Sequence, residues 1–167
     1  MFREMRRKNQ VLTTEESIAI LNRGTAGVLA VLGDNDYPYA VPISYVYHDN
    51  KIIFHSARSG HKLDSITKNQ KVSFCVIDED QIVPEEYTTY FRSVIAFGKA
   101  RIIEDDSERR KALELLTEKY SAQMPKEHIA AAIDKEIKAV CMIELEIEHL
   151  SGKESIEFVR AKKQKTD

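Results

Sequence analysis

The first half of the sequence alternates short apolar, β-branched runs with turn clusters, and this alternation constrains the fold more than any other feature. The runs are Thr25 to Leu32 (TAGVLAVL), Tyr39 to Tyr47 (YAVPISYVY) and Ile52 to His55. Strands joined by connections this short pair antiparallel. The first run is apolar enough to be a strand buried on both faces. Pro42 interrupts the second run, so an edge, a bulge or a non-strand neighbour is expected there.

The rest of the sequence continues this pattern. Lys71 to Ile77 predicts a fourth strand, and the acidic segment from Asp78 to Glu86 predicts a solvated loop. Thr88 to Ile103 predicts a long strand, with a bulge at Gly98. Between Cys141 and Glu148, apolar residues alternate with Met142 and three glutamates, which predicts a half-buried strand. Its solvated face carries Glu144, Glu146 and Glu148, and Ser155 to Val159 predicts a last short strand.

Helix signals separate these runs. Thr13 and Glu16 form a capping-box pattern ahead of a short amphipathic helix. A second helix is expected over Lys62 to Lys68. The longest helix follows the cap at Asp105, with a buried stripe of Ala112, Leu113, Leu116 and Tyr120. Another helix is expected after Pro125, which suits a first-turn position.

Length and charge fit a single globular domain. The chain has 167 residues, with 25 Lys and Arg against 27 Asp and Glu. This balance gives no overall attraction to nucleic acid or to an anionic membrane. The basic N-terminus is not followed by a long apolar stretch, so a cytoplasmic protein without a membrane span is expected. We predict one mainly β domain over residues 1–160, a small antiparallel barrel with appended helices, and a disordered tail over 161–167.

The segment from His55 to Asp64 (HSARSGHKLD) is the one most suited to chemistry. A phosphomonoester requires cations, hydroxyls and free backbone amides. Arg58, His61 and Lys62 supply charge, Ser56 and Ser59 supply hydroxyls, and the helix after Gly60 supplies amides. A second interpretation stays open, in which Ser59 only caps the helix and the basic residues are solvated. Basic side chains at a helix N-terminus are mildly unfavourable without an anion.

Three stretches carry a resemblance to a known family: Tyr37 to Tyr47, Phe54 to Asp64 and Lys71 to Phe74. Met1 to Arg7 and Tyr87 to Ala100 match the same group in style. In this order and spacing they resemble the nitroimidazole-resistance (Nim-type) flavoproteins. These belong to the pyridoxamine 5'-phosphate oxidase-like superfamily of FMN-binding split β-barrels. The resemblance covers most of residues 1–120.

The resemblance implies an FMN site at the interface of a homodimer. The strand at Pro42, Ile43, Ser44 and Tyr45 would lie along the isoalloxazine ring. The ribityl chain and phosphate would be held by His55, Ser56, Ala57, Arg58, Ser59, His61 and Lys62. Thr89 and Ser93 would approach the flavin from the same or the partner subunit. The implied activity is a reductase that passes electrons from reduced FMN to a small acceptor, such as a nitroimidazole or another nitro-aromatic.

Two other functions stay open at this stage. The protein could be a flavin-binding store or sensor without turnover, because retention and catalysis would use the same residues. The barrel could also hold a deazaflavin, or haem with His55 or His61 as axial ligand. The sequence contains no P-loop, no nucleophile elbow and no zinc ligand set, which is typical of an enzyme whose cofactor carries the chemistry.

Overall fold

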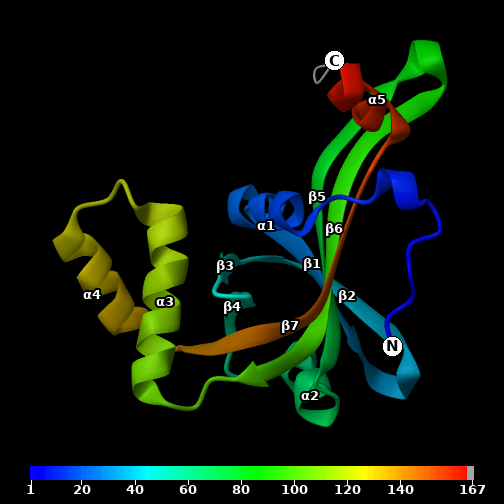
Figure 1. Ribbon diagram of the computed structural model, residues 1–167. Helices are drawn as coiled ribbons and strands as arrows, with labels where there is room; N and C mark the ends of the chain where they lie inside the picture. The colour runs from blue at the N-terminus through cyan, green and yellow to red at the C-terminus, as the bar shows by residue number, and fades with distance from the viewer. Residues whose placement is uncertain (165–167) are drawn as a thin grey trace.

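The computed structural model describes residues 1–164, and its centre is one seven-stranded antiparallel sheet (Figure 1). The strand order is β2-β1-β5-β6-β7-β4-β3. The strands are β1 (Ala26–Leu32), β2 (Pro38–Ser44), β3 (Val46–His48), β4 (Lys51–Ala57), β5 (Lys71–Val83), β6 (Thr88–Ile102) and β7 (Val140–Glu154). The helices are α1 (Thr14–Arg23), α2 (His61–Lys68), α3 (Asp106–Ser121), α4 (Lys126–Glu136) and α5 (Ile156–Gln164), with short 3-10 turns η1 (Lys8–Gln10), η2 (Asp34–Asp36) and η3 (Pro84–Glu86).

The sheet curls so that its two edge strands, β2 and β3, follow each other in the chain. The predicted single strand from Tyr39 to Tyr47 is in fact broken at Tyr45. There the backbone N–H of Tyr45 donates to the Tyr120 hydroxyl at 2.9 Å, and the hydroxyl donates to the Tyr45 carbonyl. A side chain of α3 thus replaces the missing strand neighbour. Pro42 lies on the edge strand β2, and an edge position was one of the three settings expected for it.

Two apolar clusters fill the structure. The larger lies inside the curled sheet, around Tyr45, Phe54 and Phe74, which are 0% exposed. The smaller lies between α3, α4 and the outer side of β3 and β4. The predicted apolar stripe of α3 is confirmed: Ala112, Leu113 and Leu116 are buried, and Tyr120 packs against the same cluster. Asp105 caps α3, whereas Pro125 is the N-cap of α4 rather than a first-turn residue.

Several local predictions are confirmed. Thr13 and Glu16 form both hydrogen bonds of the capping box at the start of α1. The register of β6 against β7 shifts between Phe97 and Gly98, at the predicted bulge. A Cβ at Gly98 would lie 1.9 Å from the backbone oxygen of Glu146, so the close approach of β6 to β7 at this position requires glycine.

The burial predictions for β1 and β7 need correction. Residues of β1 alternate between buried and more exposed, so only one face of this strand lies in the core. In β7, Glu146 and Glu148 are exposed, but Glu144 is 7% exposed. Glu144 lies between two cations, with Lys51 Nζ at 3.1 Å and Arg101 Nε at 2.8 Å. A carboxylate is stable at this depth because both partners are charged.

The segment from Asp78 to Glu86 is not a loop, because β5 runs through it to Val83. A bulge after Ile77 leaves Asp78 out of the ladder, and residues 79–83 then pair with Thr88 to Arg92. Only Pro84–Glu86 and Tyr87 form the turn. The β5–β6 hairpin therefore extends beyond the barrel as a long two-stranded arm (Figure 1).

The C-terminal prediction also fails, because Ile156 to Val159 belong to α5, Ser155 precedes that helix, and none of these residues is in a strand. Phe158 of α5 packs against Tyr90 and lies 4.6 Å below the Arg92 guanidinium, so the helix covers one face of the arm. Lys162 forms ion pairs with Glu16 and Glu154, and residues 161–164 of the expected disordered tail are helical. Residues 165–167 lie outside the described residues. Within residues 1–164 no helix is both long and apolar enough to cross a bilayer.

A chain of ion pairs holds the base of the arm. Asp78 contacts Arg23 at 2.6 Å and Arg92 at 3.1 Å, and Arg92 continues to the buried Glu154. Burial alone raises the pKa of Asp78, but hydrogen bonds from both arginines outweigh burial and lower the pKa below its ordinary value. The ionised form is therefore the one that the folded state stabilises.

This pKa shift predicts a pH-dependent stability. A carboxyl whose folded pKa is lowered stabilises the fold above its unfolded pKa of about 4, and this stabilisation is lost as pH falls through the folded value. Asp78→Asn should cost roughly 3 kcal/mol of unfolding free energy at pH 7 and less as the pH falls from 5 to 3. Urea unfolding of both proteins across this range checks the expectation. If the free energies of unfolding of the two proteins differed by the same amount at every pH, Asp78 would not be the source of the pH dependence.

Candidate functional site

The loop between β4 and α2 has the geometry of an anion site. Gly60 is the N-cap of α2, with φ 132° and ψ 167°, a conformation that is open essentially to glycine alone. No side chain of the described residues caps α2, so Ser59 does not have the capping role of the second interpretation. The amides of Leu63 and Asp64 donate to the Gly60 carbonyl. The amides of His61 and Lys62 precede these bonds and lie at the positive end of the helix dipole.

Lys62 is the residue whose surroundings point most directly to a ligand. Its side chain is half-buried, and burial lowers the pKa of its ammonium. Among residues 1–164 no carboxylate lies within ion-pair distance of Lys62 or of the exposed Arg58. Removing an ammonium from water without a counter-ion is unfavourable. A bound phosphate would supply that counter-ion, and the residues of this loop fit it.

The side chains of His61 and Ser56 differ in their surroundings from the rest of the loop: the His61 ring contacts another segment, and Ser56 is buried at the end of β4. The His61 ring stacks on Tyr39 at 4.3 Å, and its Nε2 accepts a hydrogen bond from the Asp34 amide at 3.3 Å. His61 can therefore offer its backbone amide to an anion, while its imidazole contacts the β1–β2 connection. Ser56 is 8% exposed, whereas Ala57, Arg58 and Ser59 are exposed.

Ser44 and His55 meet in a cavity of about 290 Å³. They come from β2 and β4, and α3 and α4 complete the wall. The remaining lining residues are Leu113, Leu116, Thr117, Tyr120, Ser121, Ala132, Ile133 and Glu136. Sequence reasoning missed this wall, because a helical stripe indicates that residues are buried but not which strand ends they face. The amphipathic pattern of α3 was the only signal that included Tyr120.

The other residues predicted on β2 divide between two sides of the strand. Pro42 and Ser44 are exposed, and Ile43 packs against the core. Tyr45 is fully buried and its hydroxyl donates to the Leu21 carbonyl at 2.8 Å. Its backbone groups are bonded to Tyr120, so Tyr45 supports the strand break and does not present its side chain to a ligand. As an edge strand, β2 still has outward backbone groups without a strand partner.

Thr89 and Ser93 are not brought near α2 within one chain. Lys71, three residues after α2, pairs with Lys99, and Thr89 lies ten residues further along β6. At the rise of a β-strand this separation is about 30 Å. Thr89 and Ser93 lie opposite Ile82 and Ile77, which are 74% and 65% exposed. This outer face of the arm points away from α5.

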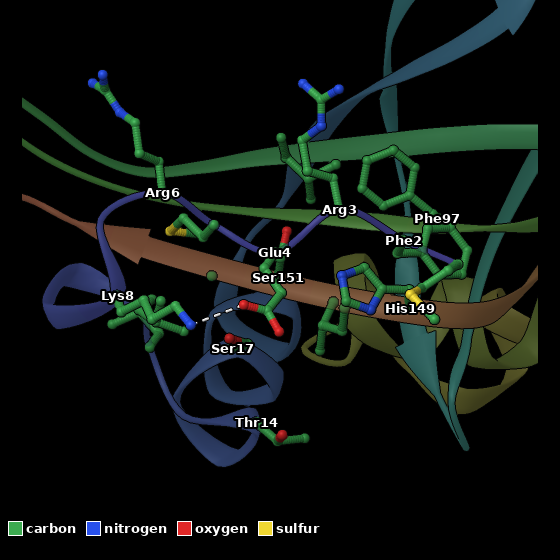
Figure 2. Close-up of a pocket in the computed structure, with 17 residues that line it drawn as sticks. Phe2, Arg3, Glu4, Arg6, Lys8, Thr14, Ser17, Phe97, His149 and Ser151 are labelled. Atoms are coloured by element: carbon green, nitrogen blue, oxygen red, sulfur yellow. Dashed lines mark ion pairs between the residues drawn. The ribbon is translucent and has the colours of Figure 1, made fainter.

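A cavity of about 920 Å³, larger than the one beside Ser44 and His55, lies on the outer face of β6 and β7 (Figure 2). The N-terminal segment crosses it, with Phe2 stacked on His149 at 4.6 Å and Lys8 paired with Glu4 at 2.9 Å. Ile95, Phe97 and Ser151 belong to its sheet side. None of the predicted site residues lines this cavity. A site chosen by cavity volume alone would therefore differ from the β4–α2 loop, which its residue types indicate.

Comparison with known proteins fits this geometry. The family model described as pyridoxamine 5'-phosphate oxidase matches residues 13–154. The chain belongs to the pyridoxamine 5'-phosphate oxidase family. No curated protein matched it. The match spans every strand and both ends of the β4–α2 loop, so the loop and the arm are parts of one family domain.

Solved structures show the same fold as this member of the pyridoxamine 5'-phosphate oxidase family. The conserved hypothetical protein Rv2991 from Mycobacterium tuberculosis is 19% identical, with a TM-score of 0.77 over 90% of each chain. A proposed 5-nitroimidazole antibiotic resistance protein from Bacteroides thetaiotaomicron is 21% identical, with a TM-score of 0.71 over 86% of this chain and 85% of that one. The FAD and haem binding protein from Mycobacterium smegmatis is 20% identical, with a TM-score of 0.71 over 89% and 74%. The predicted split antiparallel β-barrel is thereby confirmed.

Proposed function

We propose that this protein binds FMN between two copies of the chain and passes electrons from the reduced flavin to a small acceptor. The proposal rests on Lys62 at the N-terminus of α2, which is half-buried and forms no ion pair within residues 1–164. Its ammonium, the amides of His61 and Lys62 and the Arg58 guanidinium would hold the phosphate. The names of two structural neighbours, one binding FAD and haem and one associated with 5-nitroimidazole resistance, support a flavin and a nitro-aromatic acceptor.

The second copy follows from the distance between the two parts of the predicted site. Along β6, Thr89 lies about 30 Å and Ser93 about 20 Å from the Lys71–Lys99 pair beside α2, so we infer that one chain does not bring both parts to one flavin. Three isoleucines, Ile77, Ile82 and Ile95, are exposed on the outer face of the arm, which also carries Asp80 opposite Phe91. A face of this kind is typical of a protein interface. In a two-fold dimer the arm of one copy would reach the loop of the other.

The residues of the chain would act by binding and orientation. Ser44 and His55 border the cavity beside α3 and α4, where the ring and a small acceptor would meet. The edge of β2 offers backbone groups to the polar edge of the ring. Bound flavin would supply the electron transfer, because flavins carry out hydride and electron chemistry that protein side chains do not.

The absorption spectrum of freshly purified protein tests the proposal. We expect the flavin bands, about one FMN per chain after titration, and the mass of a dimer by light scattering. Haem and deazaflavin absorb differently, so the same spectrum separates them. A colourless protein that does not quench FMN fluorescence on titration would contradict the proposal.

A turnover assay separates the reductase from a flavin store. Loaded protein should oxidise a nicotinamide donor steadily when a nitroimidazole is present, and at a much lower rate without it. Reduction of the flavin in a single turnover, with no steady consumption of donor, would favour the store or sensor.

A further inference from the structure

Lys153 lies directly beside Ser93, on the same face of the sheet. The register of β6 against β7 pairs Ser93 with Lys153, and Ile77 of β5 pairs with Ser93 from the other side. Directly opposite residues in antiparallel strands project from the same face. Lys153 therefore joins the outer face of the arm, together with Thr89, Phe91 and Ser93.

The ammonium of Lys153 forms no ion pair with a carboxylate in the part of the chain that the structure describes. Its Nζ lies 5.2 Å from the centroid of the Phe91 ring, which fixes the direction of the side chain. In the ladder Asp80 pairs with Phe91 and so lies on the same face as Lys153, whereas Glu154 is turned to the opposite face, is 3% exposed and binds Arg92 and Lys162. Among residues 1–164 no acidic side chain forms an ion pair with Lys153. This face thus presents the Lys153 ammonium without an ion pair to any acid that the structure describes.

From this juxtaposition we infer that Lys153 contributes a positive charge to the flavin ring held by the other subunit. The inference rests on the proposed function, in which the arm of one copy meets the flavin of its partner. The phosphate already has Arg58, Lys62 and the amides of α2 on the opposite side of the site. The ring is the remaining part of the flavin that becomes negative, and it does so on reduction. A cation near it stabilises the reduced form more than the oxidised form.

The midpoint potential of bound FMN tests this role. Lys153→Gln should weaken the binding of reduced FMN relative to oxidised FMN on the order of tenfold, which lowers a two-electron midpoint potential by about 30 mV. Lys99→Gln is the matched control, because Lys99 lies on the same strand pair beyond the bulge and pairs with Glu148. It should keep the wild-type potential. An unchanged potential in Lys153→Gln would overturn the inference, while failure of the wild-type protein to bind FMN would instead overturn the proposed function.

A mixed dimer tests whether Lys153 acts across the interface. The mixed dimer has one subunit with Lys62→Ala and one with Lys153→Gln, and it is isolated through a different purification tag on each subunit. If the two lysines of a site come from different chains, one of its two sites keeps both lysines. Half of the flavin should then bind with wild-type affinity and potential. If both lysines came from one chain, no site in this dimer would be intact, and the absence of a wild-type fraction would overturn the inference.

Discussion

Lys62→Ala is expected to lower the affinity for FMN by about 10- to 100-fold, the equivalent of a lost charge-assisted hydrogen bond. The ammonium is half-buried and has no acidic partner among residues 1–164, so a phosphate would be its principal counter-ion. Riboflavin lacks the phosphate, and its affinity should change little. Fluorescence titration of the apoprotein with both compounds measures the two values.

The control for this variant is Lys68→Ala. Lys68 lies in the last turn of α2, where its Nζ contacts Asp34 at 3.2 Å, and its side chain is exposed. It shares the helix and the charge of Lys62 but lies at the other end. FMN affinity should therefore stay near the wild-type value. Equal losses of FMN and riboflavin affinity in Lys62→Ala would mean that Lys62 does not bind the phosphate.

Phe74→Ala should reduce the free energy of unfolding of the apoprotein by about 4 kcal/mol, the usual cost of deleting a large aromatic side chain from a core. Phe74 is 0% exposed, and its ring contacts Tyr45 and Phe54 at centroid distances of 4.9 and 6.4 Å. It also covers Gly27, where a Cβ would lie 2.2 Å from the ring. Removing it leaves a cavity in the middle of the barrel. Urea denaturation measures the change.

Phe2→Ala provides the comparison, because Phe2 is 43% exposed and lies on the outer face of the sheet. Its removal should cost less than about 1 kcal/mol. If the two variants were destabilised equally, the centre of the barrel would not be the main source of stability. Flavin must be absent in both measurements, since a bound ligand adds its own stabilisation.

Local patterns in the sequence predicted most of the elements because they depend on near neighbours. The capping box at Thr13, the cap at Asp105 and the bulge at Gly98 are each specified by a few adjacent residues. The errors arose where a distant partner decided the outcome. Asp78 lies in a strand region because Arg23 and Arg92 neutralise it, and Glu144 is buried because Lys51 and Arg101 surround it.

The candidate site likewise contains residues that the local sequence indicated and residues that only tertiary contacts brought together. The loop from Arg58 to Lys62 could be recognised from its residues, because glycine, hydroxyls and cations in one short segment suit an anion whatever surrounds them. The wall of α3 and α4 around Ser44 and His55 could not be recognised. Neither could the place of Lys153 beside Ser93, which is set by a register between strands about 60 positions apart in the sequence.

The amino-acid sequence by itself determined the class of fold and the composition that makes one loop suited to an anion, because strand periodicity, turn chemistry and helix capping act over a few residues. Only the tertiary structure decided which residues face one another. It placed the Tyr45 side chain in the core, extended β5 through the acidic segment after Ile77 to form the arm, and set Thr89 and Ser93 on that arm, away from α2 of the same chain. Burial and pairing depend on the summed contacts of the whole chain, and no local pattern contains that sum.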